Sequence, residues 1–231
     1  MHTRDVSSAD ISPADALQFL KEGNFRFVTA LHQPRDLLDQ MEKTKEGQTP
    51  FAAIVSCMDS RTSVELVFDQ GFGAVFSIRN AGNVVGTTVL GSLEYAAAVV
   101  GVKLIVILGH TGCGAIRGAI DGVKLGHLTA LLENICSPAE SAGWRMVHAD
   151  GTSCNAALVA QVTERNVRRG VARVLEQSPA IRALVEEEQL GIVPAVYDIA
   201  TGRIRFHDTP ADAPGVAPTA RKRQPQGLES D

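Results

Sequence analysis

The sequence predicts an α/β fold: a mostly parallel central sheet with flanking helices, an antiparallel edge strand and an N-terminal helical arm. Short apolar runs of strand length recur at 51–56, 74–78, 104–108 and 192–199. Segments with helical periodicity lie between them, at 88–100 and 156–175. Strands covered by helices on both faces read as continuous apolar runs of this kind, and ligands gather at the carboxyl ends of such strands.

The residues from Ser12 onward predict the N-terminal helical arm. Ser12 followed by Pro13 is typical of a helix start, with a capping residue before a proline at the first helical position. An apolar stripe follows at Leu17, Leu20, Phe27 and Leu31, and Gln33-Pro34 interrupts the helix. We expect a second, charged helix over 35–45 before the first strand.

The end of the chain predicts a hairpin and then a tail. The Thr201-Gly202 turn would join the 192–199 strand to an antiparallel edge strand at 203–206. From Thr209 onward prolines alternate with small and polar residues, which is typical of disorder. We therefore expect one catalytic domain over 1–208, including the arm, and a disordered tail over 209–231.

Composition excludes several classes of protein. The chain has 231 residues, of which 45% are hydrophobic and 21% charged, and its net charge is −4, so nothing favours nucleic acid or an anionic membrane as a partner. The N-terminus has no apolar core that would direct secretion, and no apolar run is long enough to span a bilayer, so we expect a cytoplasmic protein. Four unevenly placed cysteines do not make a disulfide framework.

Two motifs follow predicted strands directly. Cys57-Met58-Asp59-Ser60-Arg61 comes after the 51–56 strand, and His110-Thr111-Gly112-Cys113-Gly114 comes after the 104–108 strand. Thiolate and imidazole are favoured zinc ligands, and two cysteines with one histidine leave a fourth tetrahedral position for water. Zinc lowers the pKa of such a water to about 7 and so generates hydroxide near neutral pH.

Asp59 is the remaining candidate for the fourth position. It could bind the metal and close the site. Alternatively, Arg61, two residues away, could hold the carboxylate in a paired hydrogen bond. The site would then stay open, and Asp59 could accept a hydrogen bond from the zinc-bound hydroxide and aim it.

The two motifs together resemble the zinc motif of the β-class carbonic anhydrases, in which Cys-x-Asp-x-Arg precedes His-x-x-Cys by roughly fifty residues. Further segments resemble the family in the same order: Phe68-Asp69-Gln70-Gly71, Arg79-Asn80-Ala81-Gly82-Asn83 and Gly91-Ser92-Leu93-Glu94-Tyr95. The resemblance is close over about 48–120 and looser over 11–208. It implies reversible hydration of carbon dioxide to bicarbonate and a proton.

Residue by residue, the resemblance assigns Cys57, His110 and Cys113 to zinc, with Asp59 and Arg61 as a gating pair and Asp59 as a ligand in the closed state only. It implies a substrate pocket formed by Gln48, Phe76, Ala81 and Tyr95. It also implies a homodimer, or a tetramer built from dimers, in which Gln48, Phe76 and Tyr95 reach the neighbouring subunit's zinc. An upstream tryptophan that helps form a bicarbonate pocket in the allosteric branch of the family has no counterpart, because the only tryptophan is Trp144.

Other interpretations remain open from sequence. A related zinc hydrolase of carbonyl sulfide or carbon disulfide would use the same motifs. A non-enzymatic bicarbonate-responsive or zinc-storing protein would be favoured by loss of Asp59 or Arg61, and both are present. We expect Cys136 and Cys154 to be buried core residues, and no histidine can be assigned as the proton carrier.

Overall fold

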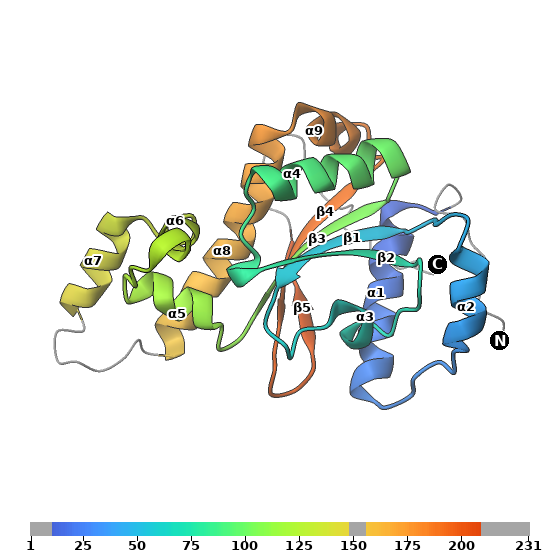
Figure 1. Ribbon diagram of the computed structural model, residues 1–231, viewed down its shortest axis with the longest axis horizontal. Coiled ribbons are helices and arrows are strands. Elements are labelled where there is room, and N and C mark those ends of the chain that lie inside the picture. Colours follow the sequence, from blue (N-terminus) through green and yellow to red (C-terminus); the bar gives the residue numbers. More distant parts are fainter. Residues whose placement is uncertain (1–10, 148–155, 209–231) are drawn as a thin grey trace, which may run out of the picture.

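The computed structural model describes residues 11–147 and 156–208 (Figure 1). A five-stranded sheet runs through this part of the chain, in the order β2-β1-β3-β4-β5. Its strands are β1 Ala52–Cys57, β2 Val75–Asn80, β3 Leu104–His110, β4 Gly191–Tyr197 and β5 Ile204–Phe206. The first four strands are parallel and β5 pairs antiparallel with β4. The predicted α/β class and the antiparallel edge strand are confirmed.

Helices connect the strands and cover the sheet. They are α1 Pro13–Val28, α2 Leu37–Thr44, α3 Val64–Val67, α4 Thr87–Glu94, α5 Gly114–Ile120, α6 Gly126–Glu133, α7 Pro138–Val147, α8 Ala156–Gln177 and α9 Pro179–Glu186. Ala81–Asn83 form a 3₁₀ turn, and Tyr95–Val100 continue α4 as a π-helix. None of the described helices is long and apolar enough to cross a membrane.

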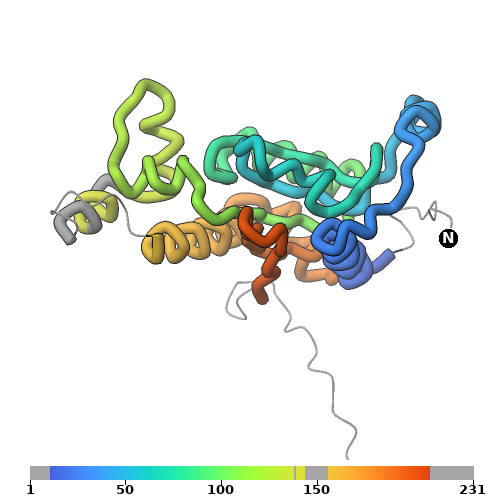
Figure 2. The backbone as a smooth tube through the Cα atoms, turned by 90° about the horizontal axis from the view of Figure 1, so that it is seen from below, coloured from blue at the N-terminus to red at the C-terminus, as the bar shows by residue number. Residues whose placement is uncertain are grey.

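Two hydrophobic cores lie on opposite faces of the sheet. Residues of α4 and α8, such as Leu93 and Val171, pack on one face, with α9 beside them (Figure 1). Residues of α1 and α3, such as Leu20 and Val67, pack on the other. The central strands β1 and β3 are buried along their whole length, which explains their uninterrupted apolar sequences. Figure 2 shows α2 extending beyond one end of the sheet and α5–α7 beyond the other.

The N-terminal arm begins as predicted and ends earlier. The Ser12 hydroxyl accepts from Asp15 N, and the Asp15 carboxylate accepts from Ser12 N, which completes a capping box in front of Pro13. The helix stops at Val28, because Ala30 adopts a left-handed backbone (φ 55°). Leu31 therefore lies beyond the helix and is exposed rather than part of its apolar stripe.

The hairpin at the sheet edge forms as the sequence indicates. Gly202 takes a positive φ of 72°, which a glycine adopts without strain, and Asp198 N donates to Arg203 O across the turn. The predicted tail over 209–231 and Cys154 lie outside the described residues.

Candidate metal centre

The candidate ligands come together because β1 and β3 are parallel neighbours that end at the same edge of the sheet. Cys57 is the last residue of β1, His110 is the last residue of β3, and Cys113 precedes the first turn of α5. One ligand atom from each of the three side chains lies within 4.8 Å of the others. The Sγ atoms of Cys57 and Cys113 are 3.9 Å apart.

This group offers what a metal ion needs. All three side chains are buried, and His110 Nε2 has no hydrogen-bond partner among the described residues. Its other ring nitrogen, Nδ1, lies 3.0 Å from Thr111 O, so a proton on Nδ1 leaves the Nε2 lone pair available beside the two sulfurs. A buried nitrogen without a partner is costly, and a cation at this point would satisfy it. The residues present therefore fit a soft or borderline divalent cation.

The two thiols titrate together. The hydrogen bond from Cys113 stabilises the Cys57 thiolate and lowers the pKa of Cys57 to about 4, against the opposing effect of burial. Gly82 N adds a donor 3.4 Å from Cys57 Sγ. The neighbouring Cys57 sulfur, together with burial, raises the pKa of Cys113. One thiolate is thus already favoured, and metal binding would release the proton of the second.

Asp59 lies beside this group but pairs with Arg61. Arg61 Nε donates to Asp59 Oδ1 at 2.9 Å and Arg61 Nη2 donates to Oδ2 at 2.7 Å. Asp59 Oδ2 remains 3.9 Å from His110 Nε2. The hydrogen bond from Arg61 holds the pKa of Asp59 far below its usual range, so this carboxylate is an acceptor throughout the neutral range.

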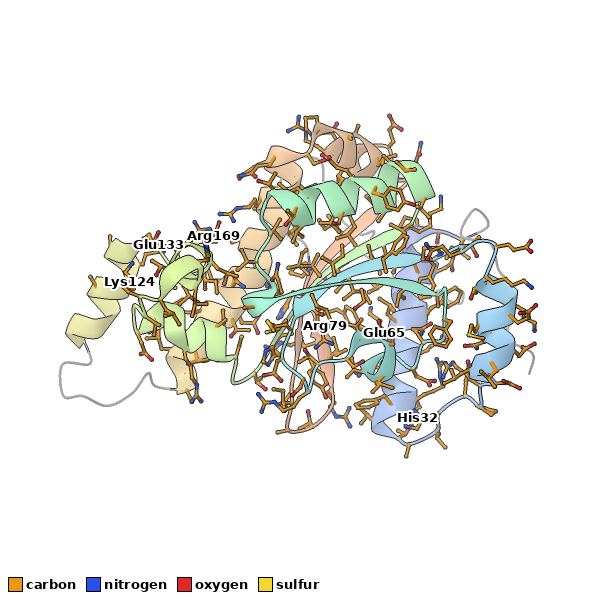
Figure 3. The ribbon with its side chains drawn as sticks, viewed as in Figure 1. His32, Glu65, Arg79, Lys124, Glu133 and Arg169 are labelled. Carbon is orange, nitrogen blue, oxygen red and sulfur yellow. The ribbon has the colours of Figure 1, made fainter. Side chains whose placement is uncertain are left out.

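Arg79 and Thr62 fix the loop that carries Cys57 and Asp59. Arg79, on β2, donates from Nε to Cys57 O at 3.2 Å and from Nη2 to Asp59 O at 2.7 Å (Figure 3). The Thr62 hydroxyl lies 2.9 Å from both of these carbonyl oxygens. Sequence reasoning noted Arg79 only as part of a resembling segment. The contact depends on strand register, which places Arg79 opposite Ser56 only in the folded sheet.

The predicted pocket residues are more scattered. Ala81 opens the turn that leads to Gly82, close to Cys57. Phe76 and Tyr95 contact each other, with ring centroids 6.2 Å apart, and Tyr95 is 53% exposed. In the register of the sheet, Cys57 lies opposite Asn80, four residues beyond Phe76, which is about 13 Å along a strand. Gln48 is exposed on the segment between α2 and β1. Within one chain, Phe76 is therefore remote from the metal group.

Comparison with known proteins decides the family. The family model described as carbonic anhydrase matches residues 52–204. Carbonic anhydrase 2 of Mycobacterium tuberculosis is 37% identical over 203 residues, covering 85% of this chain and 94% of that protein. The chain belongs to the β-class carbonic anhydrase family. It is an enzyme of this family, whose general reaction is the hydration of carbon dioxide.

Solved structures place the fold in the same class. A structure from a study of two tetrameric β-carbonic anhydrases of Sordaria macrospora superposes with a TM-score of 0.60 at 32% identity, covering 72% of this chain and 84% of that one. A β-carbonic anhydrase of Aspergillus fumigatus gives a TM-score of 0.62 at 27% identity, covering 85% and 90%. Both likenesses agree with the mostly parallel sheet described above.

Proposed function

We propose that this carbonic anhydrase uses zinc, held by Cys57, His110 and Cys113, to hydrate carbon dioxide reversibly to bicarbonate and a proton. The observation that carries the proposal is the buried group of two thiols and one unpaired imidazole nitrogen. Three protein ligands leave a fourth position open, as in catalytic zinc sites. Zinc at this point would supply a water of pKa about 7.

The roles of Asp59 and Arg61 follow from their pairing. Arg61 occupies both carboxylate oxygens and keeps Asp59 ionised beside the metal group rather than in it. Asp59 can then accept a hydrogen bond from the attacking oxygen and orient it toward the substrate carbon. Because Asp59 remains ionised, it positions the nucleophile and does not carry the proton to solvent.

A structure of the zinc-loaded protein at two pH values tests this open arrangement. We expect Asp59 to stay paired with Arg61 near neutral pH. The arrangement is wrong if an Asp59 oxygen lies about 2.0–2.2 Å from zinc at both neutral and alkaline pH.

The substrate pocket is proposed to form between two subunits. Tyr95 and Phe76 present an aromatic surface at the β2 side of the sheet, remote from the metal group of their own chain. An apolar wall suits carbon dioxide, which carries no net charge or dipole, and the amide of Gln48 could polarise one of its oxygens. Ala81 would complete the wall from the chain that holds the metal.

The proposed assembly is a homodimer, or a tetramer built from dimers. Tyr95→Ala should lower activity far more than it lowers stability or zinc content, because an exposed side chain contributes little to its own chain's core. Light scattering measures the oligomeric state of the protein used in the activity assay. A monomer with full activity contradicts the shared pocket.

A stopped-flow assay of carbon dioxide hydration tests the proposed function as a whole. Zinc-loaded protein should be active, chelator-treated protein inactive, and re-addition of zinc should restore the rate. Absence of activity in the zinc-loaded protein would contradict the proposal. The expected cytoplasmic location is a separate prediction, which fractionation of cells would check.

A further inference from the structure

The long helix α8 carries a polar side chain on its buried face that reaches out of the helix. Most residues of that face are apolar. The hydroxyl of Thr163 is satisfied inside the helix, where it donates to Val159 O. Asn166 differs, because its Nδ2 donates to Gly82 O at 2.9 Å. Asparagine is less favourable than alanine within a helix and its amide is costly to bury, so this bond explains the position better than helix formation or core packing does.

Gly82 is also the residue whose amide faces the metal group. Its N–H donates to Cys57 Sγ at 3.4 Å, while its carbonyl oxygen accepts from Asn166. Gly82 has a left-handed backbone (φ 68°), and a Cβ there would lie 2.7 Å from Ile135 Cδ1, so glycine is favoured. Because glycine has more backbone freedom than other residues, contacts from outside must hold the direction of this N–H.

The turn around Gly82 is held at its ends and at its middle. At the ends, Asn80 donates from Nδ2 to Val84 O at 2.7 Å and accepts from Val84 N at 2.8 Å. These bonds close the segment 80–84 but do not involve Gly82. The Asn166 amide supplies the bond at the middle of the turn, from a helix 84 positions further along the chain.

Helix α8 itself is packed tightly against the end of β3. Gly109, in β3, has no side chain, and a Cβ there would lie 2.8 Å from Val167 Cγ1 and 3.1 Å from Thr163 Cγ2. Both of these α8 residues lie on the same buried face as Asn166. Close packing of this kind leaves little room for α8 to shift relative to β3. Asn166 therefore presents its amide from a fixed position.

We propose that Asn166 is a positioning residue for the thiolate of Cys57. This inference rests on the zinc site proposed above, because it concerns a hydrogen bond to one of the sulfurs of that site. By holding Gly82, Asn166 keeps the Gly82 N–H directed at Cys57 Sγ. There the donor stabilises negative charge on the sulfur and fixes its orientation toward the metal.

The test compares wild type, Asn166→Ala and Asn24→Ala. Asn24 is the matched control, because both asparagines are helical, 7% exposed, and donate from Nδ2 to backbone carbonyls of distant segments. The bonds of Asn24 join α1 to Val67 O and to the β4–β5 hairpin, outside the metal group. Its loss should destabilise the fold at least as much as the loss of Asn166, so it reports what general destabilisation does to the metal site.

Zinc affinity is measured by equilibrium competition with a chromophoric chelator, and cobalt(II) then replaces zinc as a spectroscopic probe. Asn166→Ala should bind zinc about tenfold more weakly, as loss of an outer-shell contact implies. Its thiolate-to-cobalt charge-transfer band should move to longer wavelength, because a sulfur without its hydrogen-bond donor holds its electrons less tightly. Asn24→Ala should match wild type in both measurements.

A measurement on wild type does not depend on how the variants fold. With an NMR-active cadmium isotope in place of zinc, a scalar coupling should appear between the metal and the Gly82 amide proton, transmitted through the hydrogen bond to Cys57 Sγ. The coupling should be lost in Asn166→Ala. Equal zinc affinities and cobalt spectra in the two variants, or absence of the coupling from wild type, would overturn this inference and leave the zinc site in place. Failure of wild type to bind zinc would overturn the proposed function and this inference with it.

Discussion

Two aspartates ten positions apart pair with arginine in different ways. Asp59 has a side chain that is 17% exposed and a single arginine partner two residues away. Asp69 is 2% exposed and is bound by Arg26 and Arg35, both at 2.5 Å, with Gln33 N as a further donor. The Asp59–Arg61 pair closes a local loop, whereas the contacts of Asp69 join the end of α3 to the arm.

The contrast shows which observations separate a structural carboxylate from the one for which we propose a functional role. The pKa does not, because both are lowered: that of Asp59 chiefly by Arg61, and that of Asp69 to about 2 by Arg35 and Arg26 against the effect of burial. The separating features are burial, the sequence distance of the partners, and the presence of donor atoms nearby. Asp59 Oδ2 lies 3.9 Å from His110 Nε2. The structure therefore places Asp59 at the metal group and makes Asp69 a brace for the arm.

Among the substitutions that test this comparison, removal of a proposed metal ligand should have the largest effect on zinc content and activity. Cys57→Ser or Cys113→Ser replaces a thiolate by a neutral hydroxyl, so zinc should be lost and hydration should fall by more than ~100-fold, beyond what outer-shell changes cause. Metal analysis and stopped-flow measurements check both effects. Cys136→Ser is the matched control, because Cys136 is equally buried but lies outside the metal group. Stoichiometric zinc in both ligand variants would show that the wrong ligands were chosen.

The next largest effect should come from neutralising Asp59. Asp59→Asn keeps the shape of the side chain but removes the charge that orients the attacking oxygen, so kcat/KM should fall by about 100-fold while zinc is retained. Asp69→Asn makes the same chemical change at the brace and should also retain zinc. If Asp59→Asn loses its metal while Asp69→Asn does not, Asp59 is a ligand rather than a positioning group.

At the brace the expected effect is on stability. Asp69→Asn leaves two largely buried guanidinium groups without a counter-charge and should lower the free energy of unfolding by about 3 kcal/mol. Asp59→Asn should cost less than ~1 kcal/mol, since Arg61 is exposed to solvent. Urea denaturation at one fixed protein concentration measures both. Equal losses in the two variants would contradict the division of roles.

Much of the fold and the candidate ligands could be predicted from sequence because the signals are local. Continuous apolar runs indicated the buried strands, and Cys57, His110 and Cys113 stood directly after two of them. The end of α1 could not be predicted, because the left-handed Ala30 carries no distinct sequence signal. The contacts of Asp69 depend on partners more than thirty residues away, which only the folded chain brings together. The separation of Phe76 from its own metal group likewise follows from strand register rather than from any motif.

The smallest expected effect is a pH dependence specific to Asp69. Its pKa is about 2 in the folded protein, below the ordinary value of 3.8, so the unfolded chain binds the proton more readily. The stabilisation is complete above the ordinary pKa and is lost as the pH falls toward the folded pKa. The free-energy difference between wild type and Asp69→Asn should therefore shrink by roughly 1 kcal/mol between pH 6 and pH 3. Acid release of the metal affects both proteins and cancels in this difference. A difference that stays constant down to pH 3 would mean that the Asp69 carboxylate stabilises the arm through packing rather than through its charge.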